Sequence, residues 1–167
     1  MGARGDRSPS RIAGAVGLAL ALAVVAMLAR STSSWAGAED WNDANIQWMS
    51  YEDGLAAAKK DHRPICLIFY TTWCPHCANY SKVFSSSEVV KKSKSFVMVR
   101  LDKDKNTELS KKYSPDGEYI PRTYFLSPDG QLDASLAETR DQFKYFYSES
   151  EPTAILAGMD RALKKFK

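Results

Sequence analysis

Two cysteines separated by two residues closely follow an apolar run, and this arrangement constrains the fold more than any other feature of the sequence. An uninterrupted apolar run such as residues 65–70 predicts a strand that is buried on both faces. Cys74 and Cys77 come directly after it, and Pro75 between them suits the first turn of a helix, where its missing N–H is not needed. The sequence therefore predicts a buried strand followed by a helix that begins at the cysteine pair.

The expected position of Cys74 favours a reactive sulfur. Unpaired backbone N–H groups and the positive end of the helix dipole favour a thiolate over a thiol at a helix N-terminus, and the thiolate is the species that attacks disulfides. Cys77 lies one turn along and is close enough to form a ring with Cys74. His76 can add positive charge or a hydrogen-bond donor beside the thiolate. The segment therefore predicts a thiol–disulfide active site, and Cys-Pro-His-Cys, the motif of the strongly oxidising bacterial DsbA type, favours an oxidant.

A zinc site and a structural disulfide are the alternatives for this motif. Structural zinc normally takes four ligands. The chain has three cysteines and two histidines, and His62 and Cys66 lie before or within the predicted strand rather than in a second ligand pair. A purely structural disulfide is geometrically awkward across so short a loop. We therefore expect redox activity, no metal, and a Cys66 that is a small buried apolar residue.

The front of the chain has the three zones of a secretory signal. Basic residues precede an apolar stretch over residues 12–28, and a polar segment then leads to a small-residue box that ends at Ala38. We expect a signal peptide over residues 1–38 and one domain over residues 39–167. An uncleaved membrane anchor over residues 12–28 is the alternative. Either outcome places the domain outside the cytosol, most simply in a bacterial periplasm or secreted.

The charge of the predicted domain excludes some partners. Four of the 23 basic residues and one of the 20 acidic residues precede Glu39, so 19 of each remain. This balance gives no support for binding to nucleic acid or to an anionic membrane surface. Disulfide chemistry has substrates in an oxidising compartment, so exported protein thiols and disulfides are the expected clients.

The remaining segments predict an alternation of helices and strands. A serine cap begins a helix at residue 50, apolar β-branched residues indicate a strand over 96–101, and a turn signal over 127–130 predicts a hairpin. Such a chain builds an α/β fold with a mixed sheet flanked by helices on both faces. The expected helices are 50–63, 75–84, 88–92 and one that follows Pro152, and the expected strands are 65–70, 96–101, 122–126 and 131–133.

Ile120 and Pro121 directly precede one of these predicted strands. A proline lacks the N–H that a strand interior needs, so it belongs at the start or the edge of a strand. An ordinary trans proline in a loop is the alternative. After the cysteine pair and before a strand, this position is similar to one that is a cis-proline facing the cysteines in thioredoxin-like folds, so this resemblance implies a cis peptide bond here.

Taken together, these segments resemble the thioredoxin superfamily over roughly residues 45–167. The chain looks most like its small exported members, the anterior-gradient and endoplasmic-reticulum thioredoxin-like proteins and their bacterial periplasmic relatives. The resemblance implies a thioredoxin-like fold and disulfide oxidoreductase or isomerase activity without a bound cofactor. It also implies that Cys74 attacks, that Cys77 resolves the mixed disulfide, that Trp73, Pro75 and His76 tune the site, and that Ile120 and Pro121 bind an extended substrate. The stretches that carry the resemblance are 48–54, 73–77, 114–122 and 144–147.

The sequence departs from its relatives at two places. Many of them carry a buried acid six residues before the first cysteine, where this chain has Ile68. Water or another group then moves the proton at Cys77, or the resolving step is slower. The chain ends in Lys167 without a Lys-Asp-Glu-Leu-like signal, which favours a periplasmic or secreted protein over one resident in the endoplasmic reticulum lumen.

Two other functions compete with an oxidase or isomerase that acts on exported proteins. One is a periplasmic thiol reductase for cytochrome maturation, recycled by a redox partner that is membrane-bound in this version. The other is a non-catalytic chaperone or adaptor that holds clients through the cleft and the aromatic segment 144–147. We expect that segment to pack against the final helix instead. We also expect a monomer.

Overall fold

The computed structural model describes residues 1–2 and 40–166, and residues 40–166 belong to one compact unit. Apart from the first two positions, the predicted signal peptide over residues 1–38 lies outside the described residues, as does the alternative anchor over residues 12–28. Within the part that is described, no helix has both the length and the apolar character needed to span a bilayer.

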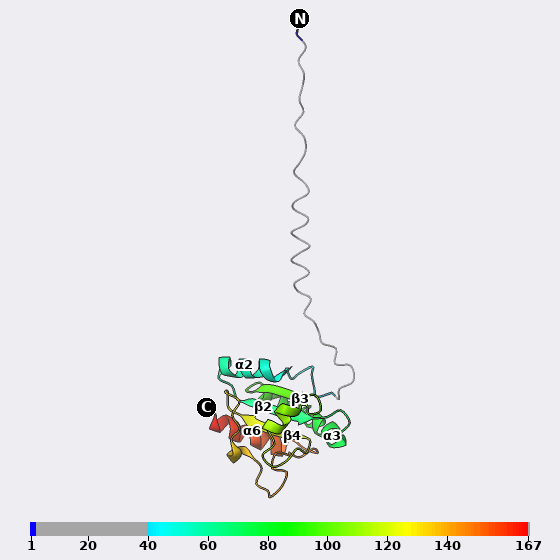
Figure 1. Ribbon diagram of the computed structural model, residues 1–167, viewed down its shortest axis with the longest axis vertical. Helices are drawn as coiled ribbons and strands as arrows, with labels where there is room; N and C mark the ends of the chain where they lie inside the picture. The colour runs from blue at the N-terminus through cyan, green and yellow to red at the C-terminus, as the bar shows by residue number, and fades with distance from the viewer. Residues whose placement is uncertain (3–39, 167) are drawn as a thin grey trace. The chain divides into compact units, whose positions relative to one another are not determined.

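A four-stranded mixed sheet forms the centre of this unit (Figure 1). Its strands are β1 (Trp48–Met49), β2 (Ile65–Tyr70), β3 (Val97–Asp102) and β4 (Arg122–Leu126), in the order β1-β3-β2-β4. β3 runs parallel to both β1 and β2, whereas β4 is antiparallel to β2. All six residues of β2 are buried, so the strand predicted from the apolar run is confirmed.

Helices cover both faces of the sheet, with α2 on one side and α3 and α6 on the other (Figure 1). α2 begins where the Ser50 hydroxyl accepts a hydrogen bond from the Asp53 N–H, and α6 carries its apolar residues on the face that packs on β4. The α/β fold predicted from the sequence is therefore confirmed. The described helices are α2 (Tyr51–Asp61), α3 (Pro75–Val83), α4 (Ser87–Ser93), α5 (Thr107–Lys112) and α6 (Thr153–Lys165), with a 3₁₀ turn at Ala134–Leu136.

The alternation of side chains along β2 divides the core in two. Cys66, Ile68 and Tyr70 face the cluster that contains the cysteine pair and the inner face of α6. Leu67 and Phe69 face the cluster under α2. The strand that leads to the cysteines is thus enclosed on both sides, which fixes the position of its C-terminal end.

The hairpin expected after β4 is only partly present. Gly130 makes the turn at φ +77°, and its N–H bonds to the Ser127 carbonyl at 2.9 Å. Residues 131–133, however, form a single bridge at Leu132 and no strand, so that prediction was wrong. The chain leaves the sheet because Asp133 caps the following 3₁₀ turn. The short strand β1 and the helix α5 were not predicted.

Candidate active site

Cys74 occupies the N-cap of α3. Its backbone is extended, at φ −88° and ψ 113°, and its carbonyl accepts hydrogen bonds from the N–H groups of Cys77 and Ala78, both at 3.1 Å. Its sulfur accepts a further hydrogen bond from the Cys77 N–H at 3.2 Å. Pro75 is the first residue of the helix, where no N–H is required. A sulfur that loses its proton here keeps a charge-assisted hydrogen bond at the positive end of the helix.

All three cysteines are buried. Cys74 exposes 4 % of its surface, and Cys77, one turn into α3, exposes none. Cys66 lies in the middle of β2, and burial raises the pKa of its thiol. A thiol with a raised pKa stays protonated at neutral pH and does not attack. The geometry therefore places Cys74 at the N-terminus of α3 and leaves Cys66 as a core residue.

Trp73 precedes Cys74, and His76 lies between the two cysteines. Each of these exposed side chains is held by a carboxylate that the sequence analysis did not predict. The indole N–H of Trp73 donates to a carboxylate oxygen of Asp104 at 2.8 Å. Nδ1 of His76 lies 2.9 Å from a carboxylate oxygen of Glu149, and its ring meets Phe146 edge-on at 6.0 Å between centroids. Both acids lie far from the motif in sequence, so only the fold brings them to it.

The Ile120–Pro121 peptide bond is cis. Arg122 pairs with Phe69 across the β2–β4 ladder, so Pro121 stands beside Tyr70 at the end of β2 that leads to the cysteines. Pro121 is buried and Ile120 half-buried. Among residues 40–166, no group hydrogen-bonds to the backbone of Ile120. The N–H and carbonyl of this residue are therefore available to a bound chain.

Arg122 is fully buried and fixes the loop before Ile120. Its guanidinium donates to the carbonyls of Gly117 and Tyr113, at 2.9 and 3.2 Å, and to the hydroxyl of Ser110. Guanidinium groups suit this role because five N–H donors in a rigid fork can satisfy several acceptors at once. The loop that presents Ile120 is thus tied to the first residue of β4.

The position of the missing acid is filled by an apolar residue. Ile68 is fully buried and pairs across the sheet with Thr123. The Thr123 hydroxyl is 2.9 Å from the hydroxyl of Tyr80, which lies one turn beyond Cys77 on α3. Burial raises the pKa of Tyr80, so this hydroxyl pair stays neutral and does not replace a carboxylate as a proton acceptor.

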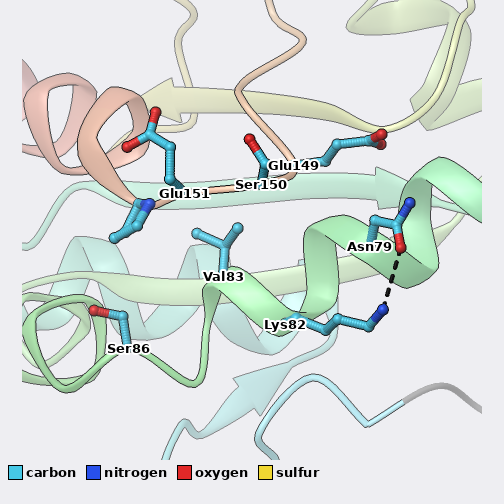
Figure 2. Close-up of a pocket in the computed structure, with 8 residues that line it drawn as sticks. Asn79, Lys82, Val83, Ser86, Glu149, Ser150 and Glu151 are labelled. Carbon is cyan, nitrogen blue, oxygen red and sulfur yellow. Dashed lines mark hydrogen bonds between the residues drawn. The ribbon is translucent and has the colours of Figure 1, made fainter.

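A surface hollow of about 530 Å³ lies along the outer side of α3 (Figure 2). Figure 2 shows that α3 forms one wall and the segment before α6 the other, with Lys82 bonded to Asn79. Glu149 joins this hollow to His76, but neither cysteine lines it. Within residues 40–166, no three side chains of His, Cys, Asp or Glu gather in a way that could hold a metal ion. The residues that line the hollow are Asn79, Lys82, Val83, Ser86 and residues 149–152.

Comparison with known proteins places this geometry in a family. The family described as Thioredoxin-like matches residues 47–128. The anterior gradient protein 2 homologs of Homo sapiens and Mus musculus are 30 % and 31 % identical over 128 residues, which are 76 % of this chain and 71 % of each relative. The chain belongs to the thioredoxin-like family. The predicted thioredoxin-like fold and the resemblance to anterior gradient proteins are therefore confirmed.

Solved structures support the same assignment. The structure titled DsbH oxidoreductase matches with a TM-score of 0.54 and 28 % identity, covering 72 % of this chain and 85 % of that one. A thioredoxin from Thermus thermophilus matches with a TM-score of 0.57 and 21 % identity, covering 73 % and 90 %, and this likeness shows the fold. Members of the thioredoxin-like family are generally thiol–disulfide oxidoreductases.

Proposed function

We propose that this protein is a thiol–disulfide oxidoreductase of exported proteins that works through Cys74 and Cys77. The observation that supports it most directly is the sulfur of Cys74 at the N-cap of α3, with a hydrogen bond from the Cys77 N–H. A capping sulfur gains from the same donors that normally bind a serine or aspartate oxygen, and the gain is greatest for the anion.

The proposed reaction starts with the Cys74 thiolate. It attacks one sulfur of a client disulfide, so a bond forms between Cys74 and that sulfur while the client bond breaks and its other sulfur leaves as a thiolate. Cys77 then loses its proton and attacks Cys74, which releases the second client sulfur. The client disulfide is reduced to two thiols, and the protein is oxidised to a Cys74–Cys77 disulfide. The reverse sequence oxidises a client.

Client binding is proposed at Ile120 and Pro121. The unpaired backbone of Ile120 lies at the edge of the sheet near the cysteines, so an extended client segment can add to it as a short strand. Trp73 stands exposed beside Cys74, fixed by Asp104, and shapes the approach to the sulfur. No bound cofactor is needed for this chemistry, since the electrons pass between sulfur atoms.

The setting of the reaction is part of the proposal. The three-zone N-terminus and the relation to anterior gradient proteins favour a compartment outside the cytosol, as a bacterial periplasmic or secreted protein. A recycling partner must exchange electrons with the Cys74–Cys77 pair after each turnover. The Cys-Pro-His-Cys motif favours the oxidising direction, because a more stable thiolate stabilises the reduced protein and makes a stronger oxidant.

A trapping experiment tests the proposal. In the full-length Cys77→Ala variant the mixed disulfide cannot be resolved, so exported proteins should accumulate as adducts on Cys74 that reducing agents release. Cys66→Ala is the matched control and should trap nothing, because both active-site cysteines remain. Recovery of only a membrane electron donor and a cytochrome factor would favour the reductase. A Cys74→Ser variant that keeps full function in cells would favour the adaptor.

A further inference from the structure

In the segment 144–147, Tyr147 lies in the core cluster that α6 lines, and the residues before it make other contacts. Together with residue 143 they form a tight turn, in which the Phe146 N–H bonds to the Phe143 carbonyl at 3.0 Å. We refer to residues 143–146 as the aromatic turn. The ring of Phe143 packs edge-on against Tyr119 at 4.9 Å between centroids, and the ring of Phe146 meets His76 at 6.0 Å. One short turn therefore touches both the residue before Ile120 and the residue between the two cysteines.

Hydrogen bonds hold the backbone of the aromatic turn in place. The Lys144 N–H donates to a carboxylate oxygen of Asp116 at 2.7 Å, and the Tyr145 N–H donates to the hydroxyl of Tyr119 at 3.0 Å. The Tyr145 carbonyl accepts from the Thr123 N–H of β4 at 2.8 Å. The turn is thus fixed both to the loop that presents Ile120 and to the outer edge of the sheet.

Phe143 has a conformation and an exposure that packing alone does not explain. Its φ is +53°, in the left-handed region that a bulky side chain rarely adopts, and such backbone strain is concentrated at functional sites. Half of its surface is exposed. Within residues 40–166, the large apolar side chains that are exposed are Trp73 and Phe143. One adjoins Cys74 and the other adjoins Tyr119, so both border the proposed binding site for clients.

We propose that Phe143 is a specificity-determining residue that selects clients with an apolar side chain near the reactive cysteine. This inference rests on the proposed function. An extended client that pairs with the Ile120 backbone and delivers its sulfur to Cys74 passes close to Tyr119 and His76, the two residues whose rings the aromatic turn contacts. Side chains two residues apart lie on the same face of a strand, so the client residue two positions from the cysteine is the one that we expect to meet the ring of Phe143. An apolar client side chain buries that ring, whereas a small polar one leaves it in water.

The proposal is tested with the full-length protein, three oxidised substrates and the Phe143→Gly variant. Glycine adopts the left-handed backbone freely, so this change removes the ring and keeps the turn. The substrates are glutathione disulfide and two disulfide peptides that differ only in Leu or Ser two residues from the cysteine. We expect the wild type to prefer the Leu peptide in kcat/KM. Phe143→Gly should reduce that preference about fivefold or more, which is a larger change than any change in its rate with glutathione disulfide.

Two further variants separate a role in selection from a role in stability. Phe143→Trp has a large apolar side chain at this position and should prefer the Leu peptide as the wild type does. Phe166→Ala, which removes a phenyl group at the far end of α6, should leave it unchanged. An unchanged preference in Phe143→Gly, or an equal slowing with all three substrates, would overturn the inference. A wild type that fails to react even with glutathione disulfide would instead overturn the proposed oxidoreductase function.

Discussion

The contacts of the buried Arg122 guanidinium predict that its removal lowers the free energy of unfolding. Replacing Arg122 with methionine keeps most of its volume but removes every donor. The carbonyls of Gly117 and Tyr113 would then lose hydrogen bonds of 2.9 and 3.2 Å, and the Ser110 hydroxyl would lose a partner. Ser110 and Tyr113 are buried, so solvent does not replace the guanidinium there, whereas Gly117 is exposed and water can reach its carbonyl.

The magnitude follows from the two well-formed carbonyl contacts. A buried polar group left without its partner costs about 1–3 kcal/mol, which applies in full to the buried Tyr113 carbonyl and in part to the partly buried Gly117 carbonyl, so the two together give roughly 2–4 kcal/mol. Contacts of the guanidinium with the rings of Phe69 and Tyr124, at 5.0 and 5.9 Å, are lost as well. Part of this loss is offset, because methionine carries no buried charge to desolvate. We expect Arg122→Met to lower the free energy of unfolding by about 3 kcal/mol.

Equilibrium urea unfolding, followed by tryptophan fluorescence, measures this change. Arg63→Met is the matched control, since Arg63 is 37 % exposed and its removal should cost less than about 1 kcal/mol. Arg122→Lys should fall between wild type and Arg122→Met, because one ammonium group cannot span the same acceptors. If Arg122→Met unfolds within about 1 kcal/mol of the wild type, the carbonyls do not depend on the guanidinium and the reasoning is refuted.

Three further predictions concern other parts of the fold. Gly158→Ala in α6 should lower the free energy of unfolding by about 1–3 kcal/mol, because the new Cβ would lie 2.7 Å from the Phe125 ring. This clash outweighs the better helix propensity of alanine. Thermal unfolding of the variant and the wild type measures the change. Hydrogen bonds, led by that of the Ser135 hydroxyl, lower the pKa of Asp133 to about 2. The Asp133 carboxylate therefore stabilises the fold above about pH 4, and this stabilisation is lost as the pH falls toward about 2. Acid titrations of stability should therefore show a smaller loss in Asp133→Asn than in the wild type over that range. Because burial raises the pKa of Cys66, iodoacetamide should leave that thiol unmodified until denaturant is added, and a peptide map that finds it labelled in the native protein would contradict its place in the core.

Local sequence was sufficient to predict the elements around the cysteines. Residues within a few positions of one another specify the buried strand β2, the start of α3 at Pro75 and the start of α2 after Ser50. The structure has these three elements where they were expected. The predicted strand over residues 131–133 was wrong. A turn signal predicts a reversal of the chain but not how far the returning segment pairs, and here Asp133 caps a 3₁₀ turn directly after the single bridge at Leu132.

The sequence by itself determined the Cys74–Cys77 pair at the start of a helix, the buried strand before it and the family to which the chain belongs, because each depends on residue types at short, fixed spacings. Only the tertiary structure decided what surrounds the pair. Asp104, Glu149 and the aromatic turn reach the site from segments about 30 to 75 residues away from the cysteines. Which distant side chains meet depends on how the two halves of the core pack against the sheet, and no local pattern encodes that packing.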